Sequence, residues 1–190
     1  MSSEGVRVRR PSKQELAAAV SKRLPDVIAP GLRILFCGIN PGLYSGAVGH
    51  HFARPGNRFW KVLHRAGLTD RELSPFEDRA LLDYGIGVTN LVYRTTAAAA
   101  DLDRAELRRG ARRLERKAAR YHPAFVAFAG MVAYRVAFGQ PRAPLGRQTE
   151  MLAASVVWLL PNPSGAQAAY QLDDLVRAFG ALRRAAARAA

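Results

Sequence analysis

The stretch ILFCGINPGLYSGAVGHHFARPGNRFW, residues 34–60, decides how this chain folds. Its first four residues are apolar and predict a buried strand. A segment rich in glycine and proline follows at 38–56, and we expect it to be a long loop. A helix should begin at Asn57, whose side chain suits an N-cap. Long ordered loops are usually functional, and open α/β sheets bind ligands at the carboxyl ends of their strands, so we expect the site here.

The segments on both sides extend this pattern into an α/β fold. Apolar, β-branched runs predict strands at 86–91, 124–129 and 155–160, and a short edge strand within 139–149 stays open. Helices are predicted at 13–24, 57–65, 75–83, 97–121 and 131–138, and from about 168 onward. We therefore expect a three-layer sandwich with a mostly parallel central sheet of 4–5 strands and helices on both faces. Residues 1–24 should form a basic arm with a short helix, and 25–190 a single domain.

The charge of the chain favours a polyanionic partner. The formal net charge is +14, from 29 basic and 15 acidic residues, and only four of the basic residues are lysines. Such an excess is typical of proteins that bind nucleic acid. The alternative is an arginine- and alanine-rich composition with solvated basic faces. Both interpretations apply to the arm at 1–11, which we expect to be disordered, and to the arginines within 97–121.

Several classes of protein are excluded by what the sequence lacks. Its single cysteine, Cys37, lies in the first predicted strand and rules out an internal disulfide and a cysteine-rich metal site. The chain has no apolar run of membrane-spanning length and no secretory signal, so we expect an intracellular protein. Nucleophile-elbow, nucleotide-loop and zinc-protease motifs are also missing. His50 and His51 are expected to be structural, and no metal or other cofactor is expected.

Two loop residues are candidates for chemistry. A neutral amide such as that of Asn40 is no general base, but its oxygen can orient a water for attack on a cationic centre. The alternative is an Asx-turn before Pro41. Phe52, a loop aromatic in a basic protein, suggests stacking on a base, or else a plug in the core. A second loop rich in proline and glycine, at 161–165, follows the strand at 155–160. This loop and the loop at 38–56 should face one ligand.

Together these residues resemble the mismatch-specific uracil- and thymine-DNA glycosylases, a branch of the uracil-DNA glycosylase superfamily. The likeness spans roughly residues 28–180 and lies in segments 38–42, 49–52, 55–60, 84–92, 94–96 and 160–165. It implies a monofunctional, cofactor-free DNA N-glycosylase that flips and excises uracil, thymine or related damaged pyrimidines opposite guanine. The implied partner is double-stranded DNA with G·U or G·T mismatches. The expected protein is a monomer of the cytoplasm or nucleoid.

The resemblance also implies roles for individual residues. Asn40 would position the hydrolytic water, backbone groups around Ile39 would contact the base edge, and Phe52 would stack on the flipped base. The base pocket would consist of Gly38, Ile39, Pro41, Gly42, Ser45, His51, Phe52, Asn57 and Asn90. An insertion loop would enter the duplex and read the orphan guanine, and it comprises Asn162, Pro163, Ser164, Gly165, Ala166 and Gln167.

The sequence departs from the family pattern at the insertion loop and after Val92. Bacterial relatives carry a bulky leucine and soon an arginine where this chain has Ala166, Gln167 and Ala168. Tyr93 stands where some relatives have an acidic residue. The competing hypothesis is therefore a catalytically weak or silent module that binds DNA lesions. An iron–sulfur glycosylase is excluded, because such clusters need about four thiolate ligands.

Overall fold

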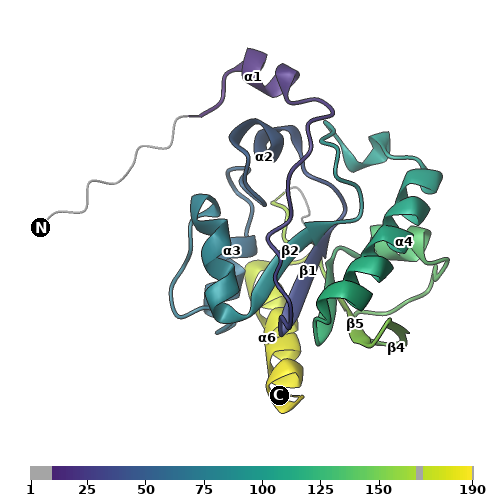
Figure 1. The fold of residues 1–190 in the computed structure, drawn as a ribbon. Helices are drawn as coiled ribbons and strands as arrows, with labels where there is room; N and C mark the ends of the chain where they lie inside the picture. The colour runs from purple at the N-terminus through teal and green to yellow at the C-terminus, as the bar shows by residue number, and fades with distance from the viewer. Residues whose placement is uncertain (1–9, 166–168, 190) are drawn as a thin grey trace, which may run out of the picture.

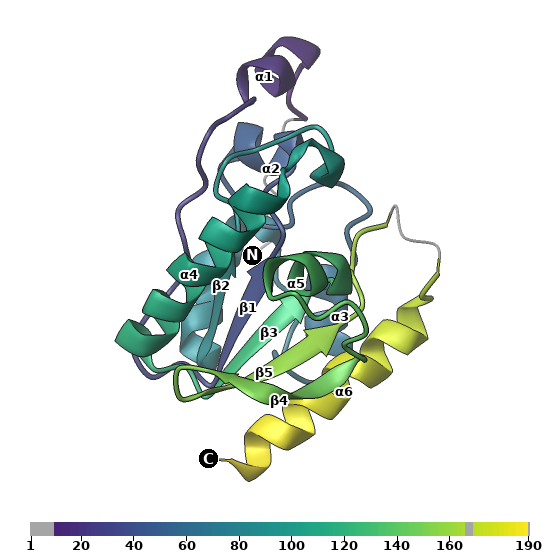
Figure 2. The same ribbon diagram turned by 90° about the vertical axis from the view of Figure 1, so that its right-hand side faces the viewer.

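The computed structural model describes residues 10–165 and 169–189 and confirms the α/β prediction. Five strands form one sheet in the order β2-β1-β3-β5-β4, which Figure 2 shows between its helical layers. β4 is antiparallel to β5, and the other neighbouring pairs are parallel. The strands are β1 (Ile34–Gly38), β2 (Ile86–Asn90), β3 (Phe125–Ala129), β4 (Gly146–Leu152) and β5 (Ser155–Leu160).

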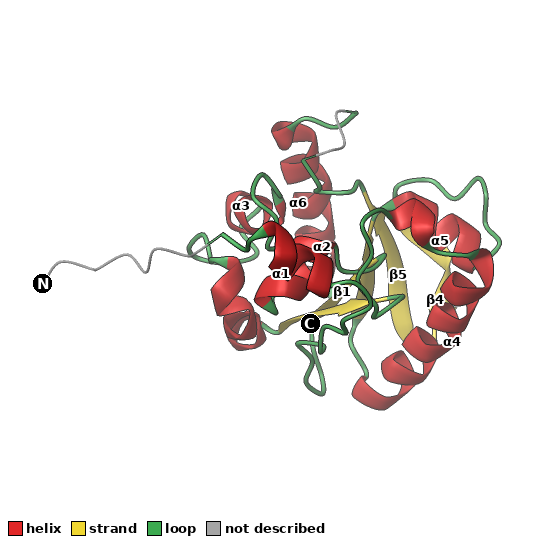
Figure 3. Ribbon diagram, turned by 90° about the horizontal axis from the view of Figure 1, so that it is seen from above, coloured by secondary structure: helices red, strands yellow, loops and turns green. Residues whose placement is uncertain are grey.

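Helices cover both faces of the sheet, as Figure 3 shows from above. The helices are α1 (Lys13–Ala18), α2 (Leu43–Val48), α3 (Phe59–Arg65), η1 (Pro75–Tyr84), η2 (Ala99–Asp101), α4 (Arg104–Tyr121), α5 (Met131–Ala137) and α6 (Leu172–Arg188). One core cluster joins α3, η1 and α6 to the sheet, and the other joins α4 and α5 to its opposite face. None of the described helices is long and apolar enough to cross a membrane.

Alternating residues of β1 supply both cores. Ile34 and Phe36 belong to the cluster under α3 and α6, whereas Leu35 and Cys37 belong to the cluster under α4 and α5. A strand covered on both faces reads as a continuous apolar run, which explains the pattern of this segment. Burial raises the pKa of the Cys37 thiol well above its usual range, so this cysteine stays protonated.

The expected long loop after β1 contains a helix. Residues 43–48 form α2, which ends at Gly49 in the left-handed conformation, with φ 80°. Six residues with an internal glycine carry too little periodicity to be recognised. α3 begins at Phe59, two residues after the predicted start, although Asn57 Oδ1 still accepts a hydrogen bond from the Phe59 N–H at 3.0 Å.

Further boundaries differ from the sequence prediction, and one of them is the start of α4, which begins at Arg104 and not at residue 97. α1 ends at Ala18 and does not continue to residue 24, because the chain there pairs with the segment after β2. The Ser21 N–H donates to the Thr95 carbonyl at 3.1 Å, and the Thr95 N–H donates to the Lys22 carbonyl at 2.9 Å. The edge strand that the sequence left open is β4, and α6 begins at Leu172.

The topology places a site at the carboxyl ends of β1 and β3. β1 lies between β2 and β3. The chain leaves β1 towards the face covered by α3 and leaves β3 towards the opposite face, where α5 lies. Connections that diverge to opposite faces open a crevice at this switch point, where α/β folds bind ligands. Figure 1 shows α1 and α2 beside this edge of the sheet.

Candidate active site

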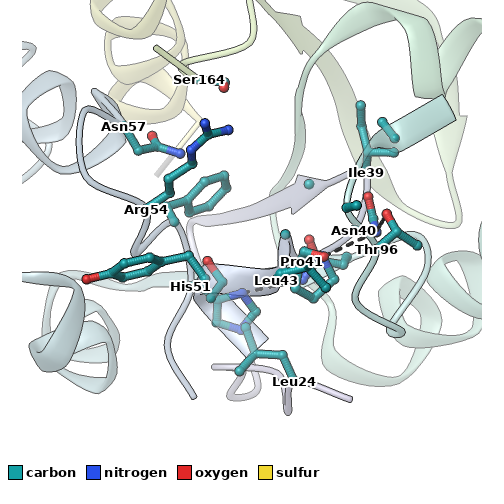
Figure 4. Close-up of a pocket in the computed structure, with 18 of the residues that line it drawn as sticks. Leu24, Ile39, Asn40, Pro41, Leu43, His51, Arg54, Asn57, Thr96 and Ser164 are labelled. Carbon is teal, nitrogen blue, oxygen red and sulfur yellow. Dashed lines mark hydrogen bonds between the residues drawn. The ribbon is translucent and has the colours of Figure 1, made fainter. Parts of the chain in front are cut away.

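A cavity of about 690 Å³ lies at this edge of the sheet (Figure 4). It brings together all ten residues predicted for the water and the base pocket: Gly38, Ile39, Asn40, Pro41, Gly42, Ser45, His51, Phe52, Asn57 and Asn90. From the predicted insertion loop, Asn162 and Ser164 line the cavity. Pro163 and Gly165 lie in the same loop outside the lining, and Ala166 and Gln167 lie outside the described residues.

The hydrogen bonds of Asn40 determine which way its amide faces. Its Nδ2 contacts three acceptors: the Pro41 and Arg94 carbonyl oxygens, both at 3.2 Å, and Thr96 Oγ1 at 2.8 Å. Only the NH₂ group can donate to two carbonyls, so the amide oxygen occupies the other position. No described residue donates to Oδ1. Because Asn40 lines the cavity, this oxygen is available to accept a hydrogen bond from a water.

The segment at 94–96 holds Asn40 in place. The Thr96 N–H donates to the Pro41 carbonyl at 3.3 Å, and the Thr96 hydroxyl donates to the Ala98 carbonyl at 2.7 Å. The Thr96 oxygen is therefore left to accept from Asn40, as Figure 4 shows. The sequence prediction gave Thr96 no role, although it lies in one of the segments that carry the resemblance.

An ion pair anchors the same segment to α4. Arg94 contacts Glu106 with two bonds, from Nε at 2.7 Å and from Nη2 at 2.8 Å. These hydrogen bonds lower the pKa of Glu106 to about 2. The pair is therefore fully charged at neutral pH. Bidentate arginine–carboxylate pairs fix orientation as well as distance, so the Arg94 carbonyl is presented to Asn40 in a defined position.

His51 and Asn90 form a second oriented pair. His51 Nε2 donates to the Pro25 carbonyl at 2.9 Å, which leaves Nδ1 as an acceptor for Asn90 Nδ2 at 3.4 Å. Burial lowers the pKa of His51, so the imidazole is neutral at neutral pH. Asn90 Oδ1 lies over Gly38, where a Cβ would come within 2.5 Å of it. Glycine at position 38 therefore leaves room for the Asn90 amide.

His50 has an acidic partner that the local sequence does not contain. Its Nδ1 lies 3.1 Å from Asp78 Oδ2 in η1, and the His51 N–H donates to the same oxygen at 3.4 Å. Asp78 is buried, and its contacts connect His50 and His51 to η1. The described residues contain no group of three or more possible metal ligands. The carboxylate beside His50 thus comes from 28 positions further along the chain.

Phe52 joins the cavity to the hydrophobic core. The side chain is half-buried, and its ring stacks on Phe59 with centroids 4.0 Å apart. Phe59 in turn packs edge-on against Phe36 of β1 at 5.3 Å. The backbone of Phe52 has φ 52°, a left-handed conformation that is unusual for a bulky residue. Strain of this kind is found most often at functional sites.

Ser45 of α2 supports the loop that carries Phe52. Its buried hydroxyl accepts the Ala53 N–H at 3.1 Å, and its carbonyl accepts the N–H groups of Gly49 and His50 at 2.8 and 3.2 Å. One small residue thus lines the cavity and closes the turn after α2. Ser45 lies where the resemblance places a small residue near the substrate.

Arg58 clamps the predicted insertion loop. Its guanidinium donates from Nε to the Pro163 carbonyl at 3.3 Å, from Nη2 to Ser164 at 3.0 Å and from Nη1 to Tyr170 at 2.6 Å. Its backbone N–H also donates to Pro163 at 3.0 Å. Gly165 packs so closely on residue 56 that a Cβ would meet the Gly56 carbonyl at 2.5 Å. Residues 163–165 and Tyr170 therefore rest on the segment before α3, which the sequence did not reveal.

Two arginines add positive charge to the cavity. Arg10 and Arg54 are both exposed and both line it, and Figure 4 shows Arg54 beside Asn57. The sequence prediction included neither of them. A cationic rim attracts a polyanion towards the cavity.

A family model of the uracil DNA glycosylase superfamily matches residues 25–183. The chain belongs to this superfamily. Membership supports DNA glycosylase activity, the hydrolysis of the N-glycosidic bond between a base and its deoxyribose. The structure also resembles the solution NMR structure of a candidate uracil DNA glycosylase from Methanosarcina acetivorans, with a TM-score of 0.55 and 16% sequence identity. That match covers 86% of this chain and 99% of the other, and it supports the fold of this uracil DNA glycosylase superfamily member.

Proposed function

We propose that this superfamily member is a monofunctional DNA N-glycosylase of the mismatch-specific branch. It flips uracil out of double-stranded DNA and excises it opposite guanine, with thymine and other damaged pyrimidines as further substrates. The orientation of the Asn40 amide carries the proposal, because its oxygen is available to hold a water at the wall of a cavity that can admit a base.

The proposed reaction breaks the bond between C1′ of the deoxyribose and N1 of uracil. The bonding electron pair leaves with the base as the uracil anion, and the sugar becomes oxocarbenium-like. Water held by Asn40 Oδ1 forms the new C1′–O bond and loses its proton to solvent. The amide accepts a hydrogen bond throughout and takes no proton, so positioning supplies the acceleration. We expect slower chemistry than in relatives that have an aspartate at this position.

Asn90 and Phe52 are proposed to recognise the flipped base. Because Asn90 Nδ2 is engaged by His51, its Oδ1 is the atom left to accept the N3–H of uracil or thymine. The N3 atom of cytosine is itself an acceptor, so Asn90 Oδ1 would repel it. One face of the Phe52 ring rests on Phe59, and the other would stack on the base, which is worth about 1–3 kcal/mol.

Opposite-base selectivity is proposed to arise from two sources. A G·U or G·T wobble pair opens at lower cost than a matched pair, so flipping itself favours mismatches. The loop that begins at Asn162 would fill the vacated space and face the orphan guanine. Its position is supported by the clamp from Arg58.

The test is single-turnover base release from a labelled duplex with one G·U pair, comparing wild type with Asn40→Ala. We expect release by the wild type and a loss of at least about a hundredfold in the variant, the scale of losing one electrostatic catalytic group. Binding of the same duplex should change little. Duplexes with G·T and A·U pairs then measure the tolerance for thymine and the requirement for guanine.

The competing function gives a different result in the same assay. A silent lesion-binding module would bind the G·U duplex tightly and release no base at any enzyme concentration. That outcome would overturn the proposed activity on this substrate. Equal release by wild type and Asn40→Ala would instead remove Asn40 from the mechanism and leave the glycosylase activity in place.

A further inference from the structure

The outer face of α4 carries a row of arginines that the proposed reaction does not use. Arg104, Arg108, Arg112, Arg116 and Arg120 occur at every fourth position and are all exposed. We call these five residues the α4 ridge. At 1.5 Å per residue the ridge is about 24 Å long. None of the five forms an ion pair with any described residue.

The helix is held firmly, so the ridge is a rigid feature. The opposite face of α4 is buried through Leu107, Gly110, Ala111, Leu114 and Ala118. Gly110 packs so closely that a Cβ there would lie 2.3 Å from the Leu91 carbonyl oxygen. The direction in which the arginines point is therefore fixed by the packing of the helix on the sheet.

We infer that the α4 ridge binds the phosphate backbone of a second segment of double-stranded DNA, separate from the duplex at the cavity. This inference rests on the proposed function only in taking DNA as the partner. Arginine suits such a surface because its guanidinium binds phosphate oxygens in a bidentate manner. The ridge carries no amide side chain for reading base edges, so we expect binding without sequence preference.

The chemistry of the ridge favours a duplex over other polyanions. Single-stranded nucleic acid is usually bound by several exposed aromatic side chains, whereas α4 has one aromatic residue, the half-buried Tyr121 at its last position, and its ring lies under Arg120. An anionic membrane would call for an exposed apolar face, whereas the apolar face of α4 is buried on the sheet. A row of charges that winds around the outer side of a firmly packed helix suits the backbone of a stiff charged rod.

The direction of α4 explains why a second segment is needed. The helix begins beside the cavity, where Glu106 pairs with Arg94, and then leads back to the start of β3 at the opposite edge of the sheet. Figure 2 shows α4 running along the side of the sheet in this way. A duplex across the cavity would reach only the first turn of the ridge. DNA with a persistence length of about 150 base pairs does not fold back within such a short distance.

The test measures whether one protein molecule bridges two duplexes. The first duplex carries a donor dye and a 2′-fluorinated deoxyuridine opposite guanine, which resists hydrolysis, and the second is undamaged and carries an acceptor dye. Wild type should bring the two together and produce energy transfer. The variant R108Q/R112Q/R116Q should lose this signal. The control R183Q/R184Q/R188Q removes the same charge from α6 on the other face and should keep it.

A second readout separates the ridge from the cavity. For undamaged duplex, the slope of log affinity against log salt should become shallower by about two to three in the ridge variant, since each phosphate contact contributes about 0.9. Single-turnover uracil release at saturating enzyme should stay at the wild-type rate. An unchanged slope, an equal loss in the control, or stronger bridging with RNA or anionic vesicles would each overturn the inference. A wild type that bridges DNA but releases no uracil would overturn the proposed function and leave the ridge in place.

Discussion

Thr96 is the residue whose hydroxyl keeps the Asn40 amide in its productive orientation. Replacing it in Thr96→Val removes the acceptor at 2.8 Å and preserves the side-chain shape. We expect single-turnover uracil release to slow by about tenfold, which corresponds to about 1.4 kcal/mol, the scale of one hydrogen bond. Affinity for the G·U duplex should change little.

The matched control is the neighbouring threonine. Thr95→Val removes a hydroxyl that donates to the Ala19 carbonyl and makes no contact with Asn40. It should lower thermal stability slightly and leave the release rate unchanged. If both variants slow release equally, the effect of Thr96 comes from the packing of segment 94–96 and not from its bond to Asn40.

His51 makes stability depend on pH in a defined direction. Because burial lowers the pKa of His51 below 6.5, the unfolded chain takes up the proton before the folded chain does. Its contribution to stability is therefore complete above about pH 6.5 and is lost as the pH falls, at up to about 1.4 kcal/mol per pH unit.

The measurement is the free energy of unfolding in denaturant between pH 5 and pH 8. His51→Gln keeps a donor for the Pro25 carbonyl and an acceptor for Asn90 without titrating in this range, so its slope should be flatter than that of wild type. His64→Gln, which removes a histidine outside the cavity, is the control. If the free energy of unfolding of His51→Gln kept the pH dependence of wild type, that dependence would not come from His51.

Sequence alone predicts the residues whose chemistry is visible in a local pattern. Asn40 and Phe52 lie in the glycine- and proline-rich segment after the buried strand β1, and both line the cavity. Thr96 could not be assigned a role, because its contact joins positions 56 residues apart. The carboxylate beside His50 was missed for the same reason, since Asp78 is 28 positions away.

At the scale of elements, Arg58 links α3 to the predicted insertion loop. Arg58→Lys keeps the charge but loses the planar fork that reaches three carbonyls. We expect faster hydrogen exchange at the amides of Ser164 and Gly165 and roughly tenfold weaker binding of the G·U duplex, because a looser loop must be ordered on binding. The maximal release rate at saturating enzyme should be preserved.

A second arginine of α3 provides the comparison. Arg65→Lys, at the end of α3, changes an exposed ion pair with Asp173 of α6 and should leave both the exchange rates and the binding unchanged. Weaker binding in both variants would show that the effect of Arg58→Lys is not specific to the clamp. A lower maximal rate in Arg58→Lys alone would place Arg58 closer to the chemistry than its contacts indicate.

Elements with a long apolar run or clear caps were predictable, and short ones were not. The central strands follow from their hydrophobicity, and Asp103 caps α4 by accepting the Glu106 N–H at 2.6 Å. α2 was missed because it buries a single residue, Ser45, and depends on its neighbours for stability. α1 was predicted too long because pairing with the segment at 94–95 outweighs helix propensity.

At the scale of the whole molecule, Phe59 joins the hydrophobic core to Phe52, the ring that is proposed to stack on the base. Phe59→Leu should lower the free energy of unfolding by roughly 1–3 kcal/mol. It should also slow uracil release, because Phe52 loses the ring on which it stacks at 4.0 Å. Denaturant unfolding and single-turnover release, both measured at 25 °C, check the two effects together.

Phe128 on the other face of the sheet separates stability from function. Phe128→Leu removes a buried ring that packs edge-on against Tyr134 at 5.0 Å and lies in the core under α4 and α5. It should cost a similar amount of stability with no change in the release rate. Equal slowing in both variants would mean that release follows global stability and not the Phe59–Phe52 contact.

The hydrogen bonds of residues 19–22 matter for anyone who shortens this chain. The superfamily match begins at residue 25, so a fragment cut at that point would keep every strand and nearly all of the cavity lining. It would nevertheless lose the bonds by which Ala19, Ser21 and Lys22 hold Thr95, next to the threonine that orients Asn40. A fragment that keeps these bonds therefore has to begin before Ala19, and the start of the family match at residue 25 lies too far along the chain to include them.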